Sequence, residues 1–149
     1  MHIKQILSVI FLLFLFPLPV TGMNHGNRLH ASDCDFNKGT CTRTEEISGL
    51  EITLDINPKP LTVMSELQFN VSINNKGMPV SNAETALYLT MPGMFMGKNE
   101  VLLKHSHGNN YEGSGIIPYC SSGAKTWMAE VKANIDHIMH SARYVFKLK

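Results

Sequence analysis

Two runs of alternating apolar and polar residues constrain the fold of this chain more than any other feature. The run LEITLDI at 50–56 and the run ELQFNVSI at 66–73 both place an apolar residue at every second position. Because successive side chains of a β-strand point to opposite faces, each run predicts a strand with one buried and one exposed face. Pro58 and Pro60 end the first strand, and the turn sequence NNKGMP ends the second.

Further short segments, separated by Gly, Pro, Asn or Ser, continue this pattern. They are residues 84–90, 101–105, 111–117, 126–135 and 141–148. No stretch keeps the 3.6-residue apolar period of an amphipathic helix over three turns. The sequence therefore predicts an all-β fold, an immunoglobulin-like antiparallel β-sandwich of about seven strands, with Trp127 in its core.

The first residues have the features of a secretory signal peptide. Lys4 precedes the apolar run ILSVIFLLFLF, Pro17 and Pro19 follow it, and small residues around Gly22 suit cleavage. The apolar run is shorter than the roughly 20 residues of a membrane-spanning helix. We therefore expect a periplasmic or secreted protein without strong membrane association after cleavage, and a retained anchor is the alternative.

The predicted signal peptide divides the chain into three parts. Residues 1–22 are the signal peptide, residues 23–48 a polar leader that carries a cysteine hairpin, and residues 49–149 a single β-sandwich domain. After removal of the signal, about 127 residues remain, which is enough to bury a core without help from a metal ion.

Charge and motifs exclude several classes of function. The sequence has 13 Lys and Arg and 12 Asp and Glu, and Lys4 lies in the signal, so the remaining charges balance. This balance gives no indication of a nucleic-acid partner. The sequence contains no G-x-S-x-G, no phosphate-binding loop and no CxxC. We predict that the protein is not an enzyme.

Three cysteines occur in a chain that is expected to be exported. Cys34 and Cys41 flank the turn sequence Asn-Lys-Gly in CDFNKGTC, so they can face each other across a tight hairpin. Disulfides persist outside the cytoplasm. We predict a Cys34 to Cys41 disulfide with Cys120 as the free thiol, and a Cys41 to Cys120 bridge is the competing assignment.

The predicted strand order also assigns the loops to the two ends of the sandwich. In an antiparallel array successive loops lie at alternate ends. The loops MPGMFMG at 91–97 and PYCSSG at 118–123 are therefore expected at one end, and HSHGNN at 105–110 and DHIMH at 136–140 at the other. Strands of this length separate the two ends by roughly 20 Å, so one ion cannot contact both.

The first of these ends gathers sulfur. Its candidate ligands are Met91, Met94, Met96 and Cys120. Thioether and thiolate sulfurs are soft donors that suit Cu(I), so the predicted cofactor is copper as Cu(I). In the alternative interpretation, these methionines and Phe95 are only an apolar plug that closes the sandwich, because methionine also fills irregular gaps.

The second end gathers imidazoles. Its candidate ligands are His105, His107, His137 and His140. Imidazole nitrogens suit Cu(II), Zn(II) or Ni(II), so this end is a second and weaker candidate metal site. Ordinary exposed loop histidines are an equally good interpretation. All four are expected far from Cys120, which argues against a cysteine-histidine nucleophile pair.

Two longer segments carry a family resemblance. The segments ALYLTMPGMFMGKNEVLL and NNYEGSGIIPYCSSGAKTWMAEV resemble the YtkA-like and FixH-like group of small bacterial extracytoplasmic β-sandwich domains. The resemblance covers roughly residues 50–148. Its matching residues are Met91, Pro92, Met94, Tyr111, Gly113, Gly115 and Trp127. The chain departs from the group in having no clear retained membrane anchor and in carrying the CDFNKGTC hairpin and Cys120.

The resemblance implies a metal-linked accessory role. FixH-like proteins are associated with copper-transporting pumps and with the assembly of copper-containing respiratory oxidases. The expected partners are therefore a copper pump, a copper carrier or a respiratory oxidase assembly factor. We expect an exported protein that binds or passes copper through the Met-rich loop. The alternative is a structural or protein-interaction module that needs no metal.

Overall fold

The computed structural model describes residues 33–45 and 48–149. The predicted signal peptide and most of the predicted leader lie outside these residues. The described part contains no helix, so none is present there that could cross a membrane. Its strands are β1 (Cys41–Thr44), β2 (Leu50–Asn57), β3 (Glu66–Asn75), β4 (Met78–Pro79), β5 (Glu84–Met91), β6 (Met94–His105), β7 (Asn110–Ile116), β8 (Thr126–Ile135) and β9 (Ile138–Lys147).

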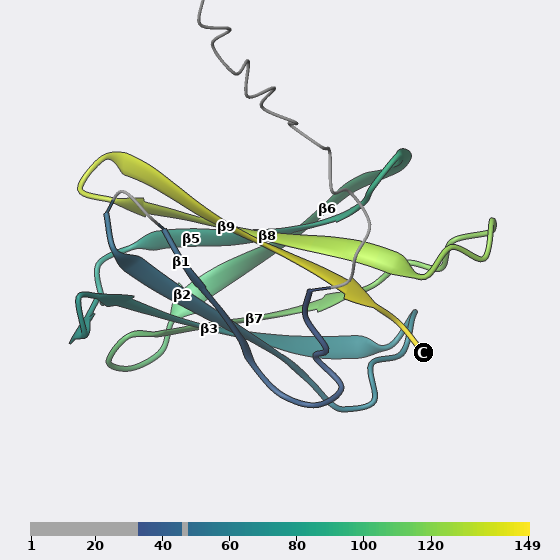
Figure 1. Cartoon of the computed structure of the whole chain (residues 1–149), viewed down its shortest axis with the longest axis horizontal. Helices are drawn as coiled ribbons and strands as arrows, with labels where there is room; N and C mark the ends of the chain where they lie inside the picture. The colour runs from purple at the N-terminus through teal and green to yellow at the C-terminus, as the bar shows by residue number, and fades with distance from the viewer. Residues whose placement is uncertain (1–32, 46–47) are drawn as a thin grey trace, which may run out of the picture.

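The strands form a two-layered, nearly closed antiparallel sheet (Figure 1). Their order is β1-β2-β3-β7-β6-β5-β8-β9, and β4 pairs with β3. Strand β6 belongs to both layers, because most of it pairs with β5 whereas Lys104 and His105 at its end pair with β7. On the opposite side β1 approaches β9, where Arg43 Nε donates a hydrogen bond to the carbonyl of Arg143 at 3.2 Å.

The all-β, antiparallel prediction is confirmed, but the count of seven strands is wrong. The structure has nine strands in the described residues, because β1 and β4 add to the predicted set. Strand β1 lies at one end of the strand order and pairs with β2. Its sequence, CTRT, lacks the alternation of apolar and polar residues from which the other strands were predicted. Strand β6 begins at Met94 and not at residue 101 as predicted. The sequence pattern missed this start because the first residues of β6 are largely exposed.

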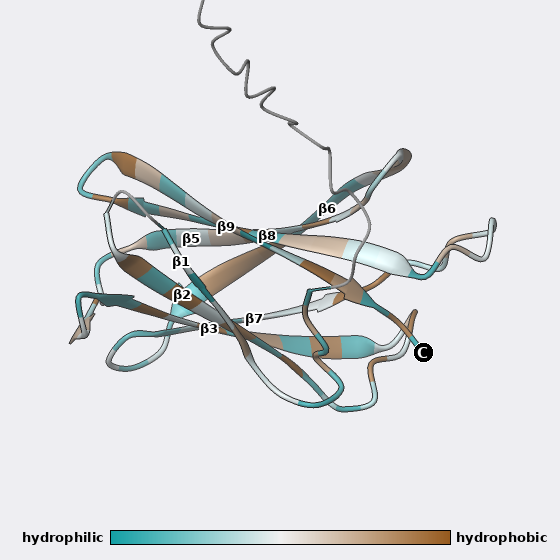
Figure 2. Ribbon diagram, viewed as in Figure 1, coloured by the Kyte–Doolittle hydropathy of each residue, from teal (hydrophilic) through white to brown (hydrophobic). Residues whose placement is uncertain are grey.

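The core lies between the two layers and is built by the alternation seen in the sequence. Figure 2 shows hydrophobic and hydrophilic residues alternating along β2 and β3. The apolar residues of both strands are buried, as is Trp127, which is 1 % exposed. Tyr144 lies among them and donates a hydrogen bond to the carbonyl of Ile52 at 2.6 Å, and burial raises the pKa of its hydroxyl. This hydrogen bond joins β9 in one layer to β2 in the other.

Two glycines allow β6 to pass close to β7 as it changes layer. A Cβ atom added at Gly113 would lie 2.5 Å from the carbonyl oxygen of Leu102. One added at Gly115 would lie 2.6 Å from Cγ2 of Val101. Both distances are shorter than real Cβ contacts allow, so the crossing requires glycine at these positions.

The predicted disulfide joins Cys34 to Cys41, with the two Cα atoms 6.0 Å apart. Cys120 is a free, buried thiol, so the competing Cys41 to Cys120 bridge is not formed. The segment before β1 lies along β9, where the backbone N–H of Cys34 donates to the carbonyl of Val145 at 3.0 Å. The disulfide therefore fixes this segment against the gap between β1 and β9.

Candidate metal centre

The Met-rich loop is the tip of the β5–β6 hairpin. Met91 ends β5 and Met94 begins β6, and the two residues face each other across the turn. Gly93 in the turn has φ +77°, a backbone conformation that favours glycine. Because directly opposed residues of a hairpin share a face of the sheet, the Met91 and Met94 side chains lie on the same side. Met91 is buried at 4 % exposure, whereas Met94 is 40 % exposed.

Alternation along β6 separates the apolar residues of the tip. Met96 packs against the core, but Phe95 is 93 % exposed. The plug interpretation expects Phe95 to be buried over the end of the sandwich, and this expectation is wrong. The residue points to the other side of the hairpin because side chains one position apart on a strand face opposite ways. The methionines and Phe95 therefore belong to different surfaces.

Cys120 meets this tip from the loop between β7 and β8. Its Sγ atom lies 3.4 Å from the Sδ atom of Met94, with the thiol directed toward the thioether. Both loops project from the same end of the molecule (Figure 1). The arrangement gives a thiol and a thioether in direct contact, with Met91 opposite Met94 on the neighbouring strand. Met96 packs against the core, and no contact of this kind in the described residues brings Met91 or Met96 to Cys120.

The surroundings of Cys120 favour its ionised form. Its Sγ lies 3.0 Å from the hydroxyl of Ser122, and this hydrogen bond lowers the pKa of the Cys120 thiol. The backbone N–H of Ser122 lowers the pKa further, while desolvation opposes both effects. A thiolate is the form of cysteine that binds metal. Ser122 was not identified from the sequence, because a serine in a Ser-Ser-Gly turn is ordinary.

A small pocket opens beside Cys120. Its volume is about 240 Å³, and Cys120 and Trp127 are among its lining residues together with Val63, Tyr119 and Leu148. Cys120 as a whole residue is 5 % exposed. The hollow therefore reaches Cys120, and Met94 is not among its lining residues.

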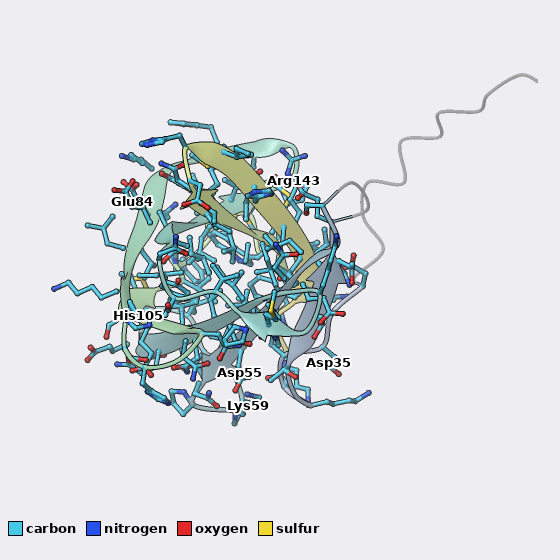
Figure 3. The ribbon with its side chains drawn as sticks, turned by 90° about the vertical axis from the view of Figure 1, so that its left-hand side faces the viewer. Asp35, Asp55, Lys59, Glu84, His105 and Arg143 are labelled. Atoms are coloured by element: carbon cyan, nitrogen blue, oxygen red, sulfur yellow. A yellow bond between two sulfur atoms is a disulfide. The ribbon has the colours of Figure 1, made fainter. Side chains whose placement is uncertain are left out.

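His105 lies at the opposite end, which faces the viewer in Figure 3. His105 Nε2 is 3.0 Å from the carbonyl oxygen of Gly108, and His107 contacts the side chains of Ser106 and Asn110. The ring of His140 is held elsewhere, because its Nδ1 is 2.6 Å from Oε2 of Glu45. His137 is exposed in the turn between β8 and β9.

No three His, Cys, Asp or Glu side chains in the described ranges are grouped so that they could hold a metal ion. The four histidines are therefore not brought together as a ligand set of this kind. Methionine thioethers are a separate class of ligand. The contact between Met94 and Cys120 is the arrangement that makes the hairpin end the candidate metal centre.

Comparison with known proteins gives information on fold alone. No family model and no curated protein sequence matches this chain. A DUF4785 family protein from Legionella pneumophila has a similar structure, with a TM-score of 0.50 and 14 % identity over 69 % of this chain. The match spans 29 % of that protein. The GAE domain of GGA2p from Saccharomyces cerevisiae aligns over 74 % of this chain and 98 % of its own, with 15 % identity and a TM-score of 0.32, too low to indicate a shared fold.

Proposed function

We propose that this protein is an exported, non-enzymatic accessory protein that binds or passes Cu(I) at the end of the β5–β6 hairpin. The observation that carries the proposal is the 3.4 Å contact between Sγ of Cys120 and Sδ of Met94. Two soft donors from loops far apart in the sequence meet there. Cu(I) is the common biological ion that prefers such donors.

The ligands have distinct roles in this proposal. Cys120 supplies a thiolate, which the Ser122 hydroxyl favours by lowering the pKa of the thiol. Met94 supplies a thioether that is partly open to solvent. Met91, opposite Met94, and Met96, on the same strand, complete the ligand set when the hairpin tip adjusts around the ion. Thioethers have flexible side chains, so small adjustments of this kind cost little.

The same residues argue against a purely structural hairpin tip. A plug over the sandwich end would bury its most apolar member, but Phe95 is 93 % exposed and Met94 is 40 % exposed. A polar serine beside the only free cysteine of the described residues also adds nothing to an apolar plug. The structural or interaction module without metal is the alternative that the experiment below distinguishes.

The wider setting belongs to the same proposal. A disulfide between Cys34 and Cys41 is compatible with a periplasmic or secreted protein. We keep the YtkA-like and FixH-like assignment, and with it a copper pump, copper carrier or oxidase assembly factor as partner. The immunoglobulin-like classification is supported by strand order, since β2-β3-β7 and β6-β5-β8-β9 follow the order of the two sheets of that fold when β6 is placed beside β5, with which most of it pairs.

An anaerobic Cu(I) titration against a competing chelator tests the proposal. The wild type is compared with Met94→Leu, Cys120→Ser and the triple Met91, Met94, Met96→Leu variant. Leucine keeps the bulk and apolarity of methionine, so folding is retained while the thioether is lost. Met78→Leu, on an exposed methionine in β4, is the matched control.

We expect the triple variant and Cys120→Ser to weaken Cu(I) binding by at least about tenfold each, with Met78→Leu unchanged. The Cu(I) affinity of Met94→Leu should lie between that of the triple variant and that of Met78→Leu. Equal Cu(I) affinity in the wild type and the triple variant would show that the methionines are not ligands. The alternative, a structural or interaction module without metal, would then be the better interpretation. Circular dichroism of each variant separates loss of ligands from loss of fold.

A further inference from the structure

A hollow lined by lysines adjoins the candidate metal centre. Its volume is about 500 Å³, and it lies between the C-terminal end of β9 and the segment before β1. Its charged lining residues are Lys125, Lys147, Lys149 and Asp35. The smaller pocket beside Cys120 shares Lys125, Leu148 and Lys149 with it. The two hollows are thus neighbours on one surface that runs from the sulfur centre to the lysines.

The positive charge of this surface is not balanced within the described residues. Lys125, Lys147 and Lys149 make no ion pair there, whereas Lys38, Lys59, Lys98 and Lys132 each have a carboxylate partner. Asp35 is the carboxylate in the hollow, and it is engaged by Lys38 at 3.3 Å and by the backbone N–H of Asn37. Those contacts lower the pKa of Asp35 against the effect of desolvation, which is the largest influence on it.

Apolar side chains border the same surface on the side of the metal centre. Tyr119 is 64 % exposed and Val63 is 36 % exposed, and both line the pocket beside Cys120. Aromatic residues are enriched at protein–protein interfaces, and lysines beside such a residue favour a partner of opposite charge.

We propose that this lysine surface, formed by Lys125, Lys147 and Lys149, docks an acidic segment of the protein that delivers copper to Cys120 or receives it. The inference rests on the proposed Cu(I) function and names the chemistry of its partner. Charge complementarity aligns the two proteins and raises the rate of encounter. The shared border of the two hollows then brings the ligand-bearing residue of the partner next to Cys120.

Fluorescence anisotropy of a labelled peptide tests this inference without copper. The probe is a fluorescein-labelled peptide with six glutamates and one central methionine, and its counterpart has glutamine at all six positions. Both are titrated with the reduced, metal-free protein. The test variant is Lys125→Gln with Lys149→Gln. The matched control is Lys76→Gln with Lys104→Gln, which removes the same charge from two exposed lysines that make no ion pair in the described residues.

We expect the glutamate peptide to bind the wild type and the control variant alike, and the test variant about tenfold more weakly. The glutamine peptide should bind at least about tenfold more weakly than the glutamate peptide, and added salt should weaken glutamate binding, because exposed charges are screened. Equal losses in the test and control variants would overturn the inference. So would tight binding to vesicles of phosphatidylglycerol with none to the peptide, because the occupant would then be a lipid surface.

The outcome is separable from that of the proposed function. If the protein binds Cu(I) but not the peptide, the docking inference is wrong and the proposed metal centre stands. If the peptide binds through Lys125 and Lys149 but the methionine substitutions leave the Cu(I) affinity unchanged, the proposed metal centre is wrong. In that case the surface has no copper to transfer, and the inference fails in its stated form.

Discussion

Replacing Gly113 by alanine should destabilise the protein, because β6 passes directly over this position of β7. The new Cβ atom would lie 2.5 Å from the carbonyl oxygen of Leu102, 3.0 Å from Cγ1 of Val101 and 3.1 Å from Cδ2 of Leu103. Overpacking costs about 1–3 kcal/mol, and a backbone carbonyl cannot rotate away as a side chain does, so we expect about 3 kcal/mol. Alanine in a strand regains about 0.5–1 kcal/mol relative to glycine, which leaves a loss of about 2 kcal/mol.

Thermal unfolding followed by circular dichroism measures this loss. With an unfolding entropy of about 2.1 cal/mol/K per residue over some 115 ordered residues, 2 kcal/mol lowers Tm by about 8 °C. Gly39→Ala is the control, because no atom lies within 4 Å of the added Cβ there, and its Tm should change by less than about 2 °C. A Gly113→Ala protein with the Tm of the wild type would refute the close crossing of β6 and β7.

Three further predictions concern the disulfide, the thiol and the core. Replacing Cys34 and Cys41 by serine should lower the free energy of urea unfolding by about 2.5 kcal/mol, because the disulfide closes a short loop and so limits the entropy of the unfolded chain. Thiol counting on the unreduced wild type should find one free thiol. The Ser122→Ala change should raise the pKa of Cys120, so Cu(I) affinity, which rises with pH as the thiol ionises, should reach its plateau at higher pH than in the wild type. Tyr144→Phe should cost about 0.5–1.5 kcal/mol in urea unfolding, because the hydrogen bond from its hydroxyl to the carbonyl of Ile52 on β2 is lost.

The period-2 pattern predicted much of this fold because each long strand has one face in the core. Strands β2 and β3 begin where the alternation begins, and their buried residues are the apolar ones of the sequence. The pattern carries no information where a strand has no buried face. For this reason it missed β1, which has no fully buried residue, and the exposed start of β6 at Met94.

The candidate metal centre was predictable in outline and not in detail. Counting antiparallel strands places the Met-rich turn and the loop of Cys120 at one end, which is where the structure has them. The count cannot give the side to which each residue of the hairpin tip points. That depends on the register between β5 and β6, which shifts between Leu89 and Met91.

Some features depend on contacts between distant segments. The pairing of β8 with β9 brings the lysines at 125, 147 and 149 together, because Thr126 lies opposite Lys147 and the backbone N–H of Leu148 donates to the carbonyl of Lys125. The other wall of the hollow, which includes Asp35, comes from the distant segment before β1. Likewise, Glu45 reaches His140 across 95 residues of sequence. No local pattern in the sequence encodes either arrangement.

X-ray absorption spectroscopy at the copper edge tests the central claim most directly. It is performed on the reduced protein loaded with one equivalent of Cu(I), for the wild type and Cys120→Ser. We expect a first coordination shell of sulfur alone in the wild type, with one sulfur scatterer fewer in the variant. A shell that contains nitrogen from histidine, or one that is unchanged by the loss of Cys120, would contradict the all-sulfur centre formed with Met94.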